Sequence, residues 1–547
     1  MKFLKKSLLI LASGLLVGTL SGCLKKDQPK TPKDPLVIPT VDVENLEVNL
    51  PDYPSYNQGS PKTVGDYDIL DLYEVSDFHG AVDFKESSSS EAYPGLGRLA
   101  TYFDQKRSEN PGGTLLLSSG DMFQGSADSN STRGFMVNYC MNYMGFDAMA
   151  IGNHEFDWTD TWIRKNANLA YNTRKIPYLG INILDKNTQE LPDFCTKSTI
   201  VERGDYKIGI IGAIGSTLES SILYSCVENY EFVDEKDLIS AEATRLRTEE
   251  NCDVVVLLEH QGVDQIPAVE GVDAIFGGHA HENKKGVVNG ITALATKNYG
   301  RGIAHIQLKI DKNSKDVSVE TSNTGIFSFS NGDKNAYAEN EGIKTIMGQY
   351  APSINSIKNI ELATAKDNLT YNAALKNICV KSMFDSANAS LTKALADGEE
   401  GVENLPIIAA FHNVNGGIRD DVKAGKVTYG SVYAAFPFDN EVVFIKAKGS
   451  LLNKQMTNFS HLGVYRTFNT SADINVNKYY YIATTDFLAL SETGFNGPLK
   501  ALTDADLIRT GAIVRDIVAE RIYQLDEIAS SDFPNSAHGY ENIPLNW

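Results

Sequence analysis

Short apolar segments alternate with segments typical of helices over residues 66–330, and this alternation constrains the fold more than any other feature. Six apolar segments have the character of buried strands, at residues 67–75, 114–118, 146–151, 207–211, 253–258 and 273–276. Helical segments, such as residues 96–107 and 238–250, lie between them. Strands that alternate with helices form α/β folds whose sites lie at loops beyond the strand ends. We therefore expect an α/β sandwich here.

The length of the chain and one polar stretch divide it into domains. A chain of 547 residues is too long for one hydrophobic core, which predicts two large domains. Residues 331–341 are low in hydrophobicity, and residues 342–357 are typical of a helix that could act as a linker. We expect a first domain at 66–330, a linker with a helix at 331–357 and a second domain at 358–547.

The N-terminus has the pattern of an export signal. Lys2, Lys5 and Lys6 precede an apolar segment, residues 8–20, that is too short for a comfortable membrane span. The sequence Leu-Ser-Gly-Cys ending at Cys23 resembles a bacterial lipobox, and the alternative is a plain secretory signal with an incidental Cys. We expect a signal peptide at 1–22, a Pro-rich tether at 23–65, and a lipid anchor on Cys23 that holds the exported protein to a bacterial membrane, periplasmic or at the cell surface.

Charge and cysteine spacing narrow the possible partners. The net charge of −20 argues against a nucleic-acid polymer as the main partner, because such binders need a basic surface. The cysteines show neither CxxC nor zinc-finger spacing. Cys195 and Cys226 could form a disulfide in an exported protein, and buried thiols are the alternative.

Polar side chains follow five of the predicted strands at the point where each strand ends. In the sequence IGNHEFD, Gly152 breaks an apolar run and lets the backbone turn, so that Asn153 and His154 are presented from a loop. Asp157 lies three residues beyond His154 and could orient its imidazole. The candidate metal ligands at the five strand ends are Asp77, His79, Asp121, Asn153, His260, His279 and His281.

The residue types at these strand ends indicate a metal site. Imidazole and carboxylate together suit Zn²⁺, Mn²⁺, Fe or Co, whereas Mg²⁺ and Ca²⁺ prefer oxygen ligands alone. Seven ligands are too many for one tetrahedral ion and suit two ions that share a bridge. One Asp-x-His alone is more commonly a turn or a cap. Five such elements in order favour two divalent metal ions.

The ordered motifs resemble a known family. Asp77-x-His79, Gly120-Asp121, Gly152-Asn153-His154-Glu155, His260 and Gly278-His279-x-His281 are similar to the motifs of calcineurin-like metallophosphoesterases, and most similar to the 5′-nucleotidase and UDP-sugar hydrolase branch. The segment YPGLGRLATYFDQKR also resembles that branch. The resemblance implies a four-layer α/β/β/α sandwich, joined by a linker helix to a C-terminal α/β domain that binds substrate.

The resemblance also implies roles for the residues. Asp121 would bridge two metals, one held by Asp77, His79 and His281 and the other by Asn153, His260 and His279. His281 departs from the Gln or Asn that the branch often has. His154, oriented by Asp157, would be catalytic. We expect metal-activated hydroxide to attack phosphorus in line, without a covalent phospho-enzyme.

Candidate substrate-binding residues lie in the second domain. A Gly-rich turn before Arg419 suits anion binding, whereas the aromatic residues near it could equally be core. The family resemblance implies that Phe438 and Phe487 stack on a nucleobase and that Arg419 and Asn415 bind substrate. Asn413 is the alternative to Asn415, because the Asn before the two Gly is offset from the family motif. Residues 490–494, LSETG, lack the ribose-contacting Asp of the family.

We therefore expect an enzyme, a 5′-nucleotidase-like metallophosphoesterase acting on nucleotides. The alternatives are a 2′,3′-cyclic-nucleotide phosphodiesterase, a UDP-sugar hydrolase, another phosphomonoesterase acting on a small phosphate ester, or a surface lipoprotein that binds without turnover. The sequence leaves the identity of the metals and the oligomeric state open.

Overall fold

A computed structural model describes residues 33–56, 58–86, 91–450, 452, 462–467, 473–490 and 506–533. The chain divides into two compact units. The larger unit comprises residues 40–356 with 490–493, and the smaller unit comprises residues 1–39, 357–489 and 494–547. The predicted signal peptide, with Cys23 and the first residues of the tether, lies outside the described residues.

The first sheet of the larger unit has eight strands, and its centre is parallel. The central strands β2, β5, β6 and β7 run parallel to one another, while β16 lies antiparallel beside β2. β1 and β18 extend the sheet beside β2 and β16. The strands are β17 (Val317–Val319), β16 (Gly302–Asp311), β2 (Tyr67–Glu74), β5 (Thr114–Ser118), β6 (Ala148–Ala150), β7 (Tyr178–Leu179), β1 (Thr63–Val64) and β18 (Gly325–Ser328).

The second sheet has six strands, in the order β14-β15-β13-β12-β10-β9. Its four central strands are parallel, and its two edge strands are antiparallel to their neighbours. The strands are β14 (Lys284–Val288), β15 (Ile291–Ala295), β13 (Ala274–Gly277), β12 (Val254–His260), β10 (Tyr206–Ile214) and β9 (Ser198–Arg203).

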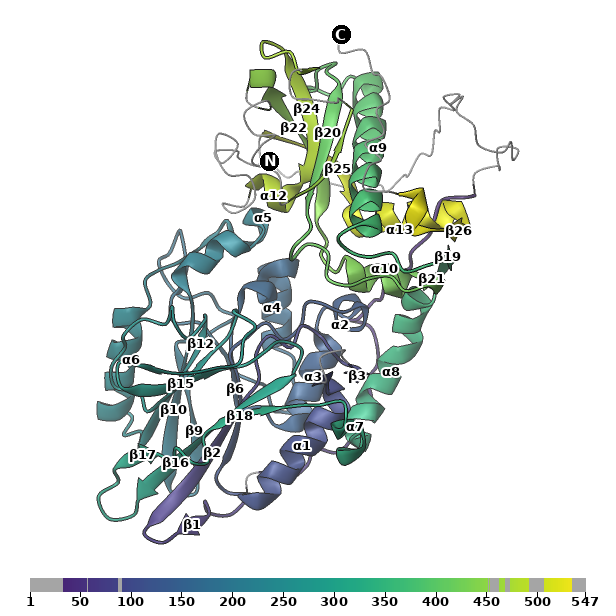
Figure 1. Cartoon of the computed structure of the whole chain (residues 1–547). Coiled ribbons are helices and arrows are strands. Elements are labelled where there is room, and N and C mark those ends of the chain that lie inside the picture. The colour runs from purple at the N-terminus through teal and green to yellow at the C-terminus, as the bar shows by residue number, and fades with distance from the viewer. Residues whose placement is uncertain are drawn as a thin grey trace. The chain divides into compact units, whose positions relative to one another are not determined.

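The two sheets pack face to face, and helices cover their outer faces (Figure 1). Because side chains alternate along a strand, Leu70 and Leu72 of β2 enter the core between the sheets, whereas Tyr73 points to the helices. The resulting order of layers, helix, sheet, sheet and helix, confirms the predicted sandwich. The covering helices are α1 (Gly95–Glu109), α3 (Phe135–Met144) and α8 (Glu341–Lys358) on the first sheet and α6 (Lys236–Thr248) on the second.

The six predicted strands are all present, with small differences at their ends. β12 is longer than predicted and ends at His260, which pairs with Ile214 of β10. His260 is therefore held by a sheet rather than by a loop. The helix α8 occupies the segment in which we predicted a linker helix.

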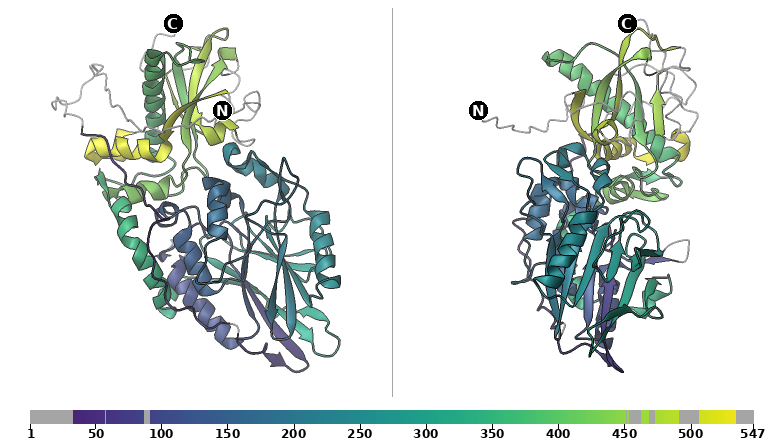
Figure 2. Two further views of the ribbon diagram at one scale, coloured as in Figure 1. Left: turned by 180° about the vertical axis from the view of Figure 1, so that it is seen from behind. Right: turned by 90° about the vertical axis from the view of Figure 1, so that its left-hand side faces the viewer.

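The smaller unit contains a five-stranded sheet and a three-stranded sheet. The helix α9 (Ala374–Asp397) lies along the five-stranded sheet (Figure 2), where Phe384 packs on Tyr465 with ring centroids 4.7 Å apart. The other face of this sheet has its own apolar core, which includes Phe411 and Ile482. The strands are β23 (Leu462–Arg466), β20 (Ile407–Asn413), β24 (Tyr479–Thr485), β22 (Glu441–Lys448) and β25 (Leu507–Ile513), then β21 (Gly425–Thr428), β19 (Glu361–Ala365) and β26 (Glu527–Ile528).

The segment predicted as a tether is partly packed against the fold. Leu46, Val48, Leu50 and Tyr53 contact the core beneath α1 and α3, and the Tyr171 hydroxyl donates to the carbonyl of Pro51. Hydrophobic side chains spaced along this segment explain why it folds onto the larger unit from residue 40 onward.

The structure settles the state of the candidate disulfide. Cys195 and Cys226 are buried thiols and do not form a disulfide with each other. Within the described residues, no helix is both long enough and apolar enough to cross a bilayer.

A buried ion pair connects the two sheets of the larger unit and supports a stability prediction. Arg203, the last residue of β9, lies with its Nη2 2.6 Å from Oδ2 of Asp147, and it also donates to the carbonyl of Thr114 on β5. Asp147→Ala would leave this buried guanidinium without the Asp147 carboxylate. We expect it to lower the free energy of unfolding by about 3–5 kcal/mol, measured by urea denaturation.

The matched control is Asp193→Ala, since Asp193 forms an exposed ion pair with Arg164 at 2.8 Å. That change should cost no more than about 1 kcal/mol. Equal effects of the two substitutions would contradict a structural role for the buried pair.

Candidate metal centre

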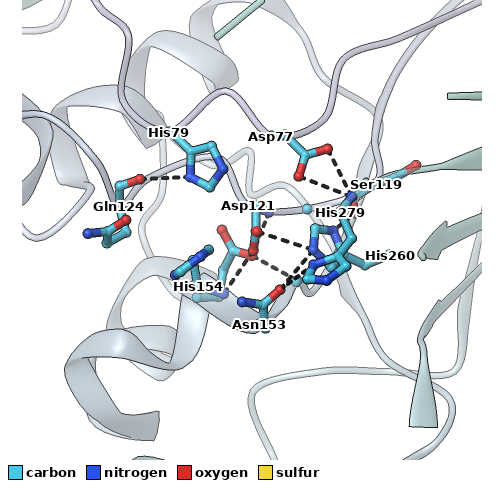
Figure 3. Close-up of polar contacts among 12 residues, drawn as sticks. Asp77, His79, Ser119, Asp121, Gln124, Asn153, His154, His260 and His279 are labelled. Atoms are coloured by element: carbon cyan, nitrogen blue, oxygen red, sulfur yellow. Dashed lines mark hydrogen bonds and ion pairs between the residues drawn. The ribbon is translucent and has the colours of Figure 1, made fainter. Parts of the chain in front are cut away.

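The structure brings the predicted ligands together at the carboxyl ends of β2, β5, β12 and β13 and at the turn after β6 (Figure 3). They form two groups in which the potential ligand atoms all lie within 4.8 Å of one another. The first set is Asp77, His79 and His281, and the second set is Asp121, His260 and His279. Parallel strands of both sheets end at this edge, so residues far apart in sequence converge here.

The backbone of the site is strained at the candidate ligands themselves. Five of them have positive φ angles, between 48° and 64°. Residues other than Gly rarely adopt this conformation, and residues held in it cluster at functional sites. The tight turns that they make aim consecutive polar side chains into one space. The five are Asp77, His79, Asp121, His279 and His281.

Gly152 is required for a reason other than the predicted turn. Its φ of −96° is accessible to any residue. A Cβ at this position, however, would lie 2.3 Å from Oδ1 of Asp121. That oxygen accepts a hydrogen bond from the backbone N–H of His154 at 2.8 Å, so the missing side chain lets Asp121 approach the next turn. Asn153 and His154 open a 3₁₀ helix, η1 (Asn153–Trp158), rather than lying on a loop.

Hydrogen bonds to backbone carbonyls fix the tautomers of two imidazoles. The Nδ1–H of His79 donates to the carbonyl of Gln124 at 3.0 Å, and the Nδ1–H of His260 donates to the carbonyl of Ser119 at 2.7 Å. A carbonyl can only accept, so in each neutral ring Nε2 carries a lone pair. This is the arrangement that metal-binding histidines adopt.

Oxygen atoms and imidazole nitrogen atoms face each other across the second set. Oδ1 of Asn153 lies 3.1 Å from Nε2 of His260 and 3.0 Å from Nδ1 of His279. Oδ2 of Asp121 is buried, lies 3.2 Å from Nε2 of His260, and accepts no hydrogen bond from the residues that the structure describes. Such a cluster of oxygen and imidazole nitrogen atoms requires a positive charge among them. The residues therefore fit a divalent cation.

The electrostatics of the second set support the same interpretation. Burial alone would lower the pKa of His260, but the carboxylates of Asp121 and Asp77 raise it to about 10. Burial alone would raise the pKa of Asp121, but the rings of His260 and His154 hold it well below its usual value. The space between His260 and Asp121 thus stabilises positive charge.

The pair His154 and Asp157 lies beside these groups. The Nδ1–H of His154 donates to Oδ2 of Asp157 at 2.9 Å, which puts the lone pair of the neutral ring on Nε2. The ring centroid of His154 is 5.2 Å from that of His79. The structure thus places a histidine suited to proton transfer next to the first set.

Glu155 is a buried residue of the site that sequence reasoning left without a role. Its carboxylate accepts hydrogen bonds from the backbone amides of Asp121, Met122 and Gly152 at 2.8–2.9 Å. Burial, together with the charge of Asp121, raises the pKa of Glu155 to about 7. It joins the turns after β5 and β6. Its position in the motif beside Asn153 and His154 was the available signal.

The candidate substrate-binding residues of the smaller unit differ in their contacts and exposure. The guanidinium of Arg419 lies 5.2 Å from the ring centroid of the half-buried Phe438. Asn415 is exposed and lies in the Gly-rich turn before Arg419. Phe487 is half-buried and packs against the apolar core of the five-stranded sheet.

Arg515, which sequence reasoning missed, holds the loop that carries Phe438. This buried side chain donates to the carbonyls of Phe436 and Phe438 at 3.3 Å and to Oδ1 of Asp439 at 2.6 Å. Its guanidinium also lies 3.8 Å from the ring centroid of Tyr433. The guanidinium of Arg515 therefore fixes this loop from inside the smaller unit.

Comparisons with known proteins agree with this geometry. Residues 71–283 match the calcineurin-like phosphoesterase family, and residues 361–471 match the C-terminal domain of 5′-nucleotidases. The chain is 25% identical to an apyrase of Tabanus yao over 410 residues, which cover 68% of this chain and 70% of that protein. It is 26% identical to a 5′-nucleotidase of Bos taurus over 424 residues, which cover 72% of each.

A solved structure shows the same fold. The 5′-nucleotidase precursor of Thermus thermophilus superposes with a TM-score of 0.65 at 19% identity, over 84% of this chain and 97% of that one. All seven candidate metal ligands fall within the first matched region. The chain is therefore a phosphoesterase hydrolase similar to 5′-nucleotidases, with a calcineurin-like phosphoesterase domain followed by a 5′-nucleotidase C-terminal domain.

Proposed function

We propose that this enzyme hydrolyses phosphate esters of nucleotides, using two divalent cations held at the strand ends. The observation that carries the proposal is the convergence of two ligand sets beside the His154–Asp157 pair. The first set would hold one cation, and the second set with Asn153 would hold the other. Asp121 would be shared between them. Zn²⁺, Mn²⁺, Co or Fe would suit these donors.

The side chains of the enzyme would position the reacting groups and transfer protons. When bound, the two cations would supply positive charge to the phosphate oxygens and lower the pKa of a water toward neutrality. His154, oriented by Asp157, would stabilise charge on the transferring phosphoryl group or protonate the leaving oxygen in line with the attack. Glu155 would keep Asp121 in place through the three backbone amides.

A nucleotide suits the polar and aromatic groups of the smaller unit. The cationic plane of Arg419 over Phe438 offers a site for an anion and an aromatic surface for a base. We assign Asn415 and Phe487 to the same role on the basis of the family motif. The relatives named above are 5′-nucleotidases and an apyrase, which supports nucleotides as the substrate class.

We also propose that the enzyme is exported and anchored to a bacterial membrane through Cys23. The support is the basic and apolar N-terminal sequence that ends in Leu-Ser-Gly-Cys. An enzyme held outside the cytoplasm would act on extracytoplasmic phosphate esters.

The first prediction from the proposed function concerns substrate and metal. Purified enzyme should release phosphate from AMP faster than from UDP-glucose, 2′,3′-cyclic AMP or p-nitrophenyl phosphate, in the presence of Mn²⁺ or Zn²⁺ and not with a chelator. Asp121→Ala should lower kcat/KM by at least about 10²–10³-fold, as expected when a group essential to charge stabilisation is removed. Substantial activity of this variant would contradict the shared-ligand assignment. Cleavage of the cyclic or aryl substrate alone would replace the proposed substrate.

The second prediction concerns base stacking. Loss of one base–aromatic contact costs about 1–3 kcal/mol, so Phe438→Ala should raise KM for AMP by about 5–150-fold. KM for p-nitrophenyl phosphate, which has no nucleobase, should change little. Tyr479→Ala removes an exposed aromatic side chain of the same unit and is the control. Equal changes for both substrates would remove the stacking role.

The third prediction concerns the anchor. Cys23→Ser should move the protein from the detergent phase to the aqueous phase in a detergent partition of cell extracts, because the lipid attachment site is lost. Mass spectrometry of the wild-type N-terminal peptide should show an acylated Cys23. An unmodified Cys23 would leave the plain secretory signal as the explanation.

A further inference from the structure

A groove on the first sheet of the larger unit plays no part in the proposed reaction. Its volume of about 900 Å³ is near the upper end of the about 300–1,000 Å³ typical of small-ligand sites. Its floor is the face of β2 from Tyr67 to Tyr73 and of β16 from His305 to Lys309. Its walls are α1 and residues 320–327, between β17 and β18 (Figure 1). None of the seven candidate metal ligands lines it, so the groove lies outside the metal centre.

Tyrosine hydroxyls open into this groove without hydrogen-bond partners. The side chains of Tyr73 and Tyr102 line it, although these residues are only 4% and 3% exposed. Within the described part of the chain, their hydroxyls form no hydrogen bond and are not enclosed. The same holds for the half-buried Tyr337, whose ring centroid is 5.6 Å from that of Tyr102. A phenol hydroxyl both donates and accepts, so a ligand that pairs with several of them must also do both.

The imidazole of His305 adds an acceptor of fixed orientation. Its ring is stacked on Tyr73 with centroids 4.3 Å apart, and Nε2–H donates to Oδ1 of Asp71 at 2.8 Å. Gln307 and Asn110 donate to the same carboxylate. Burial alone would raise the pKa of Asp71, but these three hydrogen bonds hold it below its usual value. An ionised carboxylate can only accept, so Nδ1 of the neutral ring carries a lone pair, and no residue that the structure describes donates to it.

The charged side chains of the groove neutralise one another. Nζ of Lys106 lies 3.1 Å from a carboxylate oxygen of Glu109, and Nζ of Lys309 lies 3.0 Å from one of Glu320. The complete lining contains three lysines and three carboxylate residues. A groove with balanced charge gives no electrostatic advantage to a phosphate or another anion, and it favours an uncharged ligand.

Aromatic rings give the groove flat apolar surfaces. Tyr67 is 38% exposed, and Phe327 is half-buried. The ring of Phe327 is stacked on Tyr102 with centroids 4.9 Å apart, which fixes its position in the wall. Such rings bury a large apolar area of a ligand at fixed geometry. The ligand must therefore combine an apolar face with many hydroxyl-type groups.

We infer that the groove binds an uncharged oligosaccharide, at a site separate from the proposed reaction. Sugar rings present C–H groups on their faces, which would pack on Tyr67 and Phe327. Their hydroxyls both donate and accept, and would pair with the tyrosine hydroxyls and with Nδ1 of His305. An extended peptide is less suited, because β2 and β16 are already paired on both sides and offer no free backbone groups in the floor.

Tyr102→Phe tests the inference, because it removes one hydroxyl and keeps the ring. The purified full-length chain is applied to a glycan array that carries uncharged, uronic-acid and sulfated oligosaccharides. The uncharged glycan that binds most strongly is then titrated by calorimetry. We expect binding to uncharged glycans, and Tyr102→Phe should raise the dissociation constant by about 2–12-fold, the usual effect of one lost hydrogen bond. Tyr67→Ala, which removes a ring surface, should raise it by at least about 2-fold.

Each variant has a matched control. Tyr143→Phe removes a hydroxyl from α3, in the same layer of helices, at a residue that does not line the groove. Tyr479→Ala removes an exposed tyrosine side chain of the smaller unit. Neither control should change the affinity for the glycan. Phosphate release from AMP should be the same for Tyr102→Phe, Tyr67→Ala and the wild type, since the groove lies outside the metal centre.

The outcomes distinguish this inference from the proposed function. Absence of binding to every uncharged glycan, or binding only to the anionic ones, would overturn the inference. Unchanged affinity in both groove variants, or an equal loss in Tyr143→Phe, would show that the glycan does not bind in the groove. Slower phosphate release by the groove variants would overturn the separation of the two sites. Failure of the wild type to hydrolyse AMP would contradict the proposed function and leave the glycan result standing.

Discussion

The contact on which the site depends is the close approach of buried oxygen and imidazole nitrogen atoms that need a proton or a cation between them. Oδ1 of Asn153 and Oδ2 of Asp121 lie 3.1 Å and 3.2 Å from Nε2 of His260, and none of the three atoms carries a hydrogen when the ring is neutral with its N–H on Nδ1. Buried acceptors without a donor destabilise a fold unless a cation or proton lies between them. The strained turns of Asp77 and Asp121 and the absence of a side chain at Gly152 all serve to build this cluster.

The packing of the two sheets offsets the energetic cost of this cluster. Parallel strands of both sheets end at one edge, and the core between them is formed by apolar residues such as Leu72, Leu117 and Phe276. Their burial supplies the stability against which the strain at the edge is set. His260 connects the core to the site, since it is both the last residue of β12 and a member of the second set.

Much of this arrangement could be predicted from the sequence, because it follows from local patterns. Apolar runs of strand length were sufficient to locate the six strands, and the Asp, Asn or His residues that follow five of them located the candidate ligands. The remainder depends on contacts between distant residues. The position of Glu155 in the motif marks it as a site residue but does not indicate that it binds three amides. Nothing local indicates that Arg515 would fix the loop of Phe438. We also predicted a turn at Gly152, whereas in the structure its missing side chain leaves room for the carboxylate of Asp121.

The proposed function requires the strand-end side chains to hold two cations with Asp121 between them. Crystals soaked in Mn²⁺ and measured at a wavelength with manganese anomalous signal would test this most directly. We expect two anomalous peaks about 3.5–4 Å apart, one on each side of the Asp121 carboxylate, with Asn153, His260 and His279 around one of them. A single peak at full soaking, or peaks remote from Asp121, would contradict it.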